Sequence, residues 1–304
     1  MINPTFSILI TTKNRKDDLA FTLRKIGYLI NNKDIEVVVF DDGSIDGTYE
    51  YVKYNFPTIK IHRNLKSKGY LFCRNKMLNE TKATYAVSLD DDAHFITENP
   101  LEAIFNHFEQ HATCGLIALR IFWGLESPNE IVSKEEIGRV KGFVGCAHVW
   151  RMKAWHNIPN YPEWFIFYGE EDFAGYQLFK KNWEIHYLPE VLVNHRVDIK
   201  ARKNEKDYRL RLRRSLRSGW YLYIMFYPCR EIPRRFAYTL WIQIKYKVLK
   251  GDWKATFAIV QALGDVMINL PRLLTHANRL TNKEFEDYLQ LPKTKLYWKP
   301  EKNN

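Results

Sequence analysis

Short apolar segments that end in polar residues are the feature that most constrains the fold of this chain. Residues 6–11, 35–40 and 85–89 are rich in β-branched and other apolar residues, and residues 59–62 form a weaker segment of this kind. Runs of this length and composition are typical of buried parallel strands. Because segments with helical spacing lie between them, the sequence predicts βαβ units, an α/β fold and a mostly parallel central sheet with flanking helices.

Polar residues follow three of the predicted strands at the point where each strand ends. They are Thr11 and Thr12, Asp41 and Asp42, and Asp90, Asp91 and Asp92. Open parallel sheets bind ligands at the carboxyl ends of their strands. The three clusters are therefore expected to meet at one edge of the sheet.

The triplet of aspartates points to a metal. Adjacent carboxylates repel one another unless a cation is present. In an extended segment Asp90 and Asp92 point the same way, so both could face one ligand. Carboxylate oxygens suit Mg²⁺ or Mn²⁺ shared with a diphosphate. The alternative is a solvated acidic loop before the helix expected near Pro100.

Other polar clusters have two interpretations each. Asp41 and Asp42 precede Gly43 and Ser44, a composition typical of a turn, and one carboxylate could also bind a base or ribose. The acidic run at residues 170–172 follows an aromatic segment, which favours a general base with a raised pKa, or it is an ordinary helix N-terminus. His195 is a candidate metal ligand or a buried structural histidine.

Charge is unevenly distributed along the chain. From Arg196 to the end there are 24 Lys and Arg against 10 Asp and Glu, whereas residues 1–195 hold 22 basic and 25 acidic residues. Such asymmetry predicts an anionic partner for the last third, either nucleic acid or anionic lipid.

Cysteine spacing and hydropathy bear on the compartment. The four cysteines form no C-x-x-C pair, which fits a reducing compartment, and no secretory signal is expected at the N-terminus. Residues 255–270 are the most apolar long stretch, but Gln261, Asp265 and Asn269 interrupt it, so no spanning segment is predicted. We therefore expect a cytoplasmic protein, peripheral on the inner face of the cytoplasmic membrane if its basic region binds lipid.

An ordered set of motifs carries a family resemblance. The set comprises residues 11–15 (TTKNR), residues 40–48 (FDDGSIDGT), Asn64 with Gly69, Arg74 and Asn75, residues 89–92 (LDDD) and residues 169–172 (GEED). In this order and spacing it resembles glycosyltransferase family 2, across about residues 5–197. The resemblance implies a GT-A fold, a nucleotide-sugar donor and inverting transfer.

The resemblance also implies roles for single residues. The nucleotide pocket would be lined by Thr11, Thr12, Asn14, Arg15, Asp41, Asp42, Arg74, Asp90 and Asp91. The D-x-D motif matches Asp90–Asp92, with Asp92 as a metal ligand, Asp90 at the ribose or the metal, and His195 as a further ligand. Asp172 matches the second residue of the E-D motif and would be the general base, with Glu171 beside it. Two positions depart from the pattern, Cys146 after Gly145 and Ala174.

The resulting prediction is a metal-assisted, inverting glycosyltransferase. Its domain would span residues 1–197, with a donor half to about residue 95 and an acceptor half from about 96 to 197. The donor would be UDP-, dTDP- or GDP-linked, and the acceptor a hydroxyl of a glycan or lipid-linked glycan, in bacterial surface polysaccharide or glycoconjugate synthesis.

A basic helical region is predicted at residues 198–304. Residues 196–235 carry 13 Lys and Arg against 4 Asp and Glu, interleaved with aromatic residues that include Trp220, Tyr221 and Phe226. This composition suits an anionic membrane surface. The alternative is a helical subdomain that packs on the catalytic core with its aromatic side chains buried.

Two other classes compete with the transferase. A nucleotidyltransferase also needs carboxylates and a metal, but residues 11–16 lack the glycine of a phosphate loop. A nucleic-acid or anionic-membrane binding module would use the basic region but leave the acidic clusters unexplained. No nucleic-acid partner is therefore expected.

Overall fold

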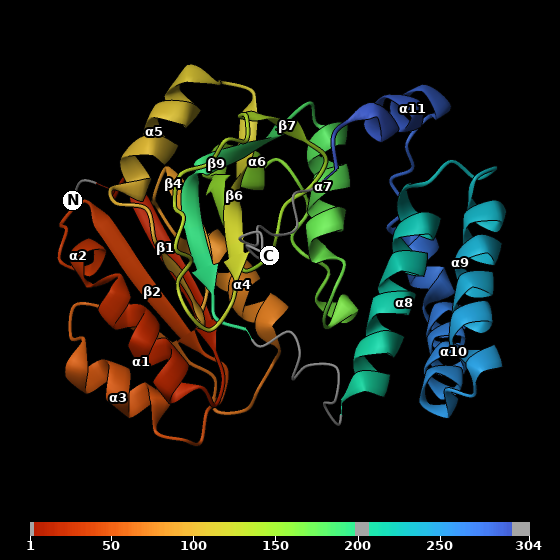
Figure 1. Ribbon diagram of the computed structural model, residues 1–304, viewed down its shortest axis with the longest axis horizontal. Helices are drawn as coiled ribbons and strands as arrows, with labels where there is room; N and C mark the ends of the chain where they lie inside the picture. Colours follow the sequence, from red (N-terminus) through yellow and green to blue (C-terminus); the bar gives the residue numbers. More distant parts are fainter. Residues whose placement is uncertain (1–2, 198–206, 294–304) are drawn as a thin grey trace.

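The structure, a computed structural model, describes residues 3–197 and 207–293. In this part of the chain a nine-stranded sheet with flanking helices is followed by a group of helices (Figure 1). The last strand ends at His195 and the next helix begins at Tyr208, so the predicted domain boundary at residue 197 lies beside residues outside the described ranges. The division into domains stays a prediction.

The first half of the sheet is parallel, as the sequence predicts. Strand β1 lies between β2 and β4, and β3 pairs with β2. In this register Thr12 lies opposite Asp41, and Thr11 lies opposite Asp90. The elements are β1 (Phe6–Thr12), α1 (Lys16–Lys25), α2 (Gly27–Ile30), β2 (Ile35–Asp41), α3 (Thr48–Asn55), β3 (Lys60–Arg63), α4 (Tyr70–Glu80) and β4 (Tyr85–Asp90).

The second half of the sheet is mixed. Strand β8 lies between β4 and β6 and is antiparallel to both, whereas β9 is parallel to β6 and antiparallel to β5 and β7. The elements are β5 (Ala93–Phe95), α5 (Pro100–Gln110), β6 (Cys114–Trp123), β7 (Gly138–Val140), β8 (Ala147–Arg151), α6 (Met152–Trp155), the 3-10 helix η1 (Glu163–Phe165), α7 (Glu170–Lys180) and β9 (Glu184–His195). The α/β class is confirmed, but the mostly parallel description holds only from β3 to β4.

Two apolar clusters cover the two faces of the sheet. Alternate side chains of a strand point to opposite faces, so Ile8 and Ile10 join the cluster that includes α1 and α5, whereas Leu9 joins the cluster that includes α4, α7 and α8. Trp150, which is fully buried, lies in the second cluster. Helix α7 therefore lies between the sheet and the C-terminal helices (Figure 1).

Helices α8 and α11 join the C-terminal helices to the apolar cluster that contains α7. Trp220, Tyr221 and Phe226 are buried in the same cluster as α7, although the sequence suggested that they contact a membrane. Asp265 of α10 accepts hydrogen bonds from Arg213 of α8. For α8 the packing alternative is therefore the correct one. The elements are α8 (Tyr208–Phe226), α9 (Ile232–Tyr246), the 3-10 helix η3 (Val248–Lys250), α10 (Trp253–Thr275) and α11 (Asn282–Gln290).

Candidate active site

The carboxyl ends of the parallel strands bring the predicted polar clusters together. Thr12 Oγ1 at the end of β1 donates a hydrogen bond of 2.8 Å to Asp91 Oδ2, beyond the end of β4. The backbone N–H of Asp42, which follows β2, donates to the carbonyl oxygen of Thr12. The three strand ends thus form one connected edge.

Asp90, Asp92 and His195 form a group that fits a metal. One ligand atom from each lies within 4.8 Å of the others. His195 stands at the end of β9, and its Nε2 lies 3.1 Å from Asp92 Oδ1. Asp92 Oδ1 is buried with His195 Nε2 as its neighbour, whereas His195 Nδ1 is buried and forms no hydrogen bond within the described residues. Carboxylate and imidazole atoms this close fit a divalent cation.

Two arginines neutralise the aspartates. Arg15, in the loop after β1, places Nη2 2.7 Å from Asp92 Oδ2 and Nη1 3.4 Å from Asp91 Oδ1. Arg74 of α4 is buried and forms an ion pair with Asp90. Burial raises the pKa of Asp91 to about 8, against the opposing charge of Arg15. Burial alone would also raise the pKa of Asp92, but the hydrogen bond and charge of His195, together with Arg15, bring this pKa well below the usual range.

Asn14 links the loop after β1 to the turn after β2. Its backbone N–H donates to Ser44 Oγ, and its side-chain Oδ1 accepts from the backbone N–H of Ile45, each at 2.8 Å. Asn14 has a φ of 52°, in the left-handed region that asparagine tolerates. Asp41 accepts a hydrogen bond from the N–H of Ser44. Both residues therefore fix the turn after β2, and Asn14 holds the loop after β1 against it.

Asp42 holds the segment that leads into α4. Its Oδ1 accepts hydrogen bonds from Asn64 Nδ2 and the N–H of Lys68, and its Oδ2 accepts from Ser67 Oγ and the N–H of Gly69. A carboxylate has about four acceptor positions, so this one is saturated by residues 64–69. In this conformation Asp42 is a positioning residue rather than a free acceptor for a base or ribose.

The acidic run begins helix α7. Gly169 precedes the helix with a φ of 90°, which glycine adopts readily, and the helix starts at Glu170. Glu170 is buried and accepts a hydrogen bond from Tyr70 Oη. Glu171 Oε1 lies so close to Gly145 that a Cβ added there would be 2.5 Å from it. Gly145 adjoins Cys146, whose carbonyl oxygen accepts a hydrogen bond from the N–H of Asp90.

Cys146 lies between Glu171 and the aspartate cluster in its electrostatic surroundings. Burial raises the pKa of the Cys146 thiol, and the charges of Asp90, Asp92 and Glu171 are among those that act on it. Burial likewise raises the pKa of Glu171 well above its usual value, and the charge of Glu170 adds to the effect. Glu171 is thus a carboxyl group of raised pKa beside the end of β4.

Asp172 faces a different part of the molecule. Burial raises the pKa of Tyr288 on α11, and the charge of Asp172 raises it further. Lys141 is a charged neighbour of Asp172, and its backbone carbonyl oxygen accepts a hydrogen bond from Tyr288 Oη. Successive residues of an α-helix point about 100° apart, so the side chains of Glu171 and Asp172 leave the helix in different directions. Glu171 lies against Gly145, whereas Asp172 has Lys141 and Tyr288 as neighbours, and the assignment of the general base stays a prediction.

Comparison with known proteins decides the family. Residues 7–175, more than half of the chain, match the family described as Glycosyl transferase family 2. The chain belongs to this family. Membership makes it a glycosyltransferase, as predicted, and decides against the nucleotidyltransferase and the binding module.

Individual relatives of the chain share less than 30% of its residues in the matched regions. An uncharacterized glycosyltransferase of Bacillus subtilis, YfnE, is 28% identical over 142 residues, which cover 45% of this chain and 36% of the relative. Residues 1–349 of S. aureus TarS, solved in complex with UDP, superpose with a TM-score of 0.57 over 90% of this chain and 83% of that fragment, at 17% identity. The mannosyltransferase PcManGT of Pyrobaculum calidifontis, solved with GDP-Man and Mn²⁺, gives a TM-score of 0.54 over 89% and 76% of the two chains, at 14% identity. These structures confirm the GT-A fold.

Sequence reasoning missed two features of the transferase site. Tyr70 and Glu170 form a buried pair beside Arg74, although Glu170 lay within the acidic run. The arginines were assigned to the nucleotide, whereas the structure pairs them with aspartates. A cluster of buried carboxylates needs nearby cations, so the charge of the aspartate triplet was a usable signal for these pairs.

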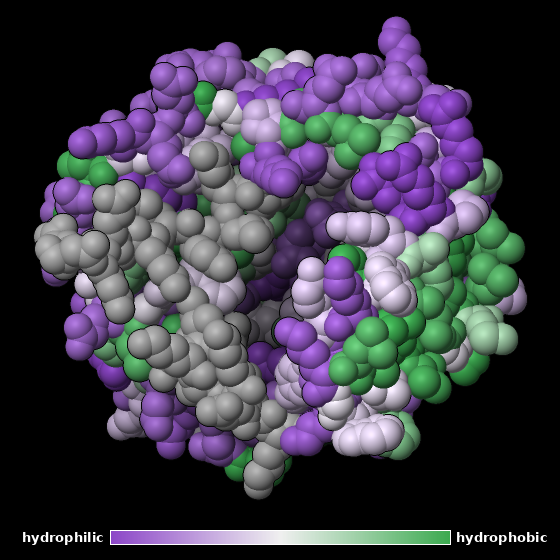
Figure 2. Space-filling model, turned by 45° about the vertical axis from the view of Figure 1, so that its right-hand side comes forward, coloured by the Kyte–Doolittle hydropathy of each residue, from purple (hydrophilic) through white to green (hydrophobic). Residues whose placement is uncertain are grey.

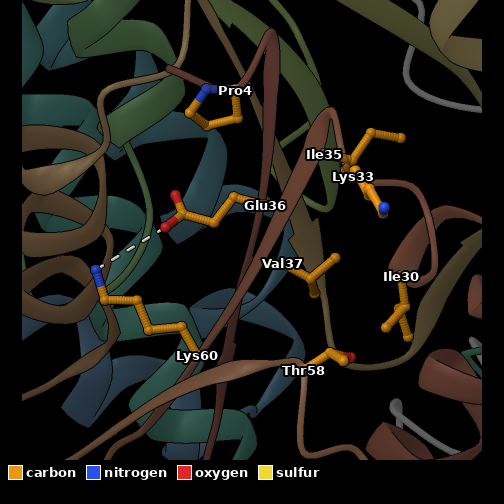
Figure 3. A pocket seen from close by; sticks show the side chains of 8 residues that line it. All are labelled: Pro4, Ile30, Lys33, Ile35, Glu36, Val37, Thr58 and Lys60. Carbon is orange, nitrogen blue, oxygen red and sulfur yellow. Dashed lines mark ion pairs between the residues drawn. The ribbon is translucent and has the colours of Figure 1, made fainter. Parts of the chain in front are cut away.

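A hollow elsewhere on the transferase is unrelated to this edge. A cavity of about 320 Å³ lies at the start of β2 and β3, where Glu36 and Lys60 form an ion pair of 3.9 Å (Figure 3). Its lining contains none of the predicted site residues. It lies at the amino ends of the strands, opposite the end that binds ligands in such sheets.

Proposed function

We propose that this glycosyltransferase moves a sugar from a UDP-, dTDP- or GDP-linked donor to a hydroxyl group of a glycan or lipid-linked acceptor, with inversion at the anomeric carbon. The observation that carries the proposal is the convergence of Asp90, Asp92 and His195 beside Glu171. The UDP and GDP-Man bound by TarS and PcManGT support the donor class. We further propose a role in bacterial surface polysaccharide or glycoconjugate synthesis, on family resemblance.

Asp92, His195 and Asp90 would hold the divalent cation, Mn²⁺ or Mg²⁺. When bound, it would neutralise charge on the departing nucleoside diphosphate. Arg15 and Arg74 already supply two positive charges at this edge. Both can exchange their aspartate partners for phosphate oxygens, since guanidinium groups bind carboxylates and phosphates alike.

Glu171 is the proposed general base. It would take the proton from the acceptor hydroxyl as that oxygen attacks the anomeric carbon in a single displacement. A raised pKa suits this role, because a stronger base accepts a proton more readily near neutral pH. Gly145 leaves room for the Glu171 carboxylate, and Glu170 is held aside by Tyr70.

Thermal stability in the presence of nucleotides tests the donor class. We expect one of UDP, GDP and dTDP, but not CMP, to stabilise the enzyme by about 2.7 kcal/mol at 100 times its Kd, and only with Mn²⁺ present. Differential scanning fluorimetry with and without Mn²⁺ measures this shift. A shift of equal size without metal would contradict the metal assignment, and no shift from any nucleotide would contradict the donor class.

The outer face of the C-terminal helices supports a second proposal, that the enzyme lies on an anionic membrane. Helix α9 has no buried residue within the described part of the chain. Large apolar side chains are exposed on α9 and α10, namely Tyr238, Trp241, Tyr246, Trp253, Phe257, Val260, Met267 and Ile268. Figure 2, which brings this side forward, shows a broad hydrophobic area. Exposed apolar patches of this kind mark interaction surfaces.

The length, composition and packing of helix α10 bear on how the enzyme would contact a membrane. It has 23 residues and, contrary to the sequence-based prediction, is by length and composition apolar enough to cross a membrane. One side of it is buried against α8, with Ala255, Ala258 and Ala262 fully enclosed. Asp265, paired with Arg213, lies on that side. We therefore propose that α9 and α10 lie in the plane of the membrane interface, with their apolar side chains inserted.

Removing two aromatic side chains tests this contact. We expect the double variant Trp241→Ser and Phe257→Ser to bind anionic vesicles at least tenfold more weakly, since partial insertion of each ring contributes on the order of 1 kcal/mol. Co-sedimentation with phosphatidylglycerol vesicles at low salt measures the change. Tyr54→Ser on α3 is the matched control, because Tyr54 is an exposed aromatic residue of the catalytic part. Equal binding by wild type and double variant would contradict the proposal.

A further inference from the structure

Three histidines lie close together at the start of β9, the part of this strand that is remote from the active site. His107 and His111 lie four residues apart at the end of α5, and His186 lies near the start of β9, against which α5 packs (Figure 1). His107 Nε2 lies 2.9 Å from His186 Nδ1, and the rings of His107 and His111 stack at 4.1 Å. One nitrogen from each ring lies within 4.8 Å of the others. We propose that these histidines bind a divalent transition metal at a site separate from the catalytic one.

The neighbours of two rings orient them for this role. Glu184 Oε2 lies 2.9 Å from His186 Nε2, so a proton on Nε2 leaves Nδ1 free to bind a metal. His111 Nδ1 lies 2.9 Å from the carbonyl oxygen of His107, which places the His111 proton on Nδ1 and frees Nε2. Metal-binding histidines commonly donate their second N–H to a carboxylate or a carbonyl in this way. Both arrangements are already present.

The surroundings of the three histidine rings favour a bound metal ion. His107 and His186 are buried, whereas His111 is half-buried and leaves the group open to solvent on one side. Glu184 is itself fixed by Thr113 and Arg139, so it stays an outer partner. Three imidazoles and one open position match a four-coordinate zinc site. Imidazole also suits copper and nickel, whereas Mg²⁺ and Mn²⁺ prefer oxygen ligands.

The metal would replace the hydrogen bond between two rings. With bonds of about 2.0–2.1 Å to zinc, tetrahedral ligand nitrogens stand about 3.3 Å apart. His107 Nε2 and His186 Nδ1 must therefore separate slightly from their present 2.9 Å. The proton now shared between these nitrogens would move to Nδ1 of His107.

Such a site would tie α5 to β9 without entering the reaction. His186 and His195 of β9 lie opposite Ile117 and Trp123 of β6, and six residues of a strand correspond to about 20 Å. The ion would cross-link the end of a helix to a central strand of the mixed half of the sheet. Its expected effect is on the stability of the acceptor half, separate from donor binding.

Zinc titration of the untagged full-length enzyme tests the site. We expect wild type to bind one Zn²⁺ that the His195→Gln variant, altered in the catalytic cluster, still binds. His111→Gln should bind this ion at least tenfold more weakly, and Glu184→Gln about 10–100-fold more weakly. His156→Gln, at an exposed histidine, is the matched control and should bind normally. Isothermal titration calorimetry and metal analysis after dialysis give affinity and stoichiometry.

Two results would overturn the proposal. One is unchanged zinc affinity and stoichiometry in both His111→Gln and Glu184→Gln, which would mean that the rings only bond to one another. The other is a single bound zinc in wild type that disappears in His195→Gln, which would place the ion in the catalytic cluster. Circular dichroism of each variant confirms that it is folded.

Discussion

Replacing Glu171 by glutamine is expected to lower the rate of sugar transfer by about 10²–10⁴-fold, the range that a general base contributes. Glutamine keeps the size of the side chain beside Gly145 but cannot accept the proton of the acceptor hydroxyl. Donor binding should persist, because Asp90, Asp92 and His195 are unchanged. Transfer assays give kcat, and nucleotide-dependent thermal shift gives donor affinity.

Asp172→Asn is the matched control for this prediction. Its side chain faces Lys141 and Tyr288 rather than the aspartate cluster, so kcat should change little. The opposite pattern, an inactive Asp172→Asn and an active Glu171→Gln, would return the role of base to Asp172. A steric test is independent of charge. Gly145→Ala puts a Cβ 2.5 Å from Glu171 Oε1, so the carboxylate must move and kcat should fall while the fold persists.

The pH dependence of wild type follows from the same residue. A general base acts in its ionised form, and burial raises the pKa of Glu171 above the ordinary value for glutamate. Activity should therefore be present at high pH and be lost as the pH falls through this raised pKa. The acid limb of kcat/KM, which reports the free enzyme, should lie above the ordinary range of a glutamate and be absent from the residual activity of Glu171→Gln.

Strands that are buried on both faces could be predicted from the sequence, and those with mixed composition could not. The runs at residues 6–11, 35–40 and 85–89 are almost wholly apolar, and each forms a strand within one residue of its predicted end. Strand β6 was missed, since Gly115 and the buried Arg120 interrupt its apolar pattern. The mostly apolar run at residues 143–150 forms a strand only from Ala147 onward.

The candidate metal group could be predicted, whereas the directions in which Glu171 and Asp172 point could not. Asp90 and Asp92 follow a strong strand, and family resemblance added His195, so two distant parts of the chain converged as expected. The base depended on the rotation of α7 about its axis, which is set by where Gly169 starts the helix. A shift of one residue turns a side chain by about 100°. Sequence spacing does not give a rotation at that precision.

The arginines near the aspartates differ from prediction, because their long side chains pair with aspartates rather than stay free for the nucleotide. Arg15 and Arg74 reach the aspartates from the β1 loop and from α4, and in doing so they neutralise a cluster that would otherwise repel itself. Pairing of this kind depends on three-dimensional proximity. Because of these ion pairs, donor phosphates must compete with aspartates for the arginines, and the metal must compete with arginines for the aspartates. The binding of donor and the binding of metal are therefore expected to depend on each other.

Asp92→Asn should remove this dependence on metal. Among the described residues, Asp92 is the one aspartate paired with both His195 and Arg15, and an amide is a much weaker ligand than a carboxylate for a hard cation. If nucleotide with Mn²⁺ binds 100-fold more weakly, its stabilisation at a concentration of 100 times the wild-type Kd falls from about 2.7 to about 0.4 kcal/mol. Differential scanning fluorimetry at fixed nucleotide and varied Mn²⁺ measures the loss.

Asp18→Asn separates loss of a metal ligand from disturbance of Arg15. Asp18 also pairs with Arg15, at 3.1 Å, but it lies outside the metal group. This variant should therefore keep the full Mn²⁺-dependent shift. If both variants lost the shift equally, the position of Arg15, rather than a metal ligand, would account for the role of Asp92. If neither lost it, the cation would bind elsewhere, and the placement of the donor diphosphate at the end of β4 would have to be abandoned.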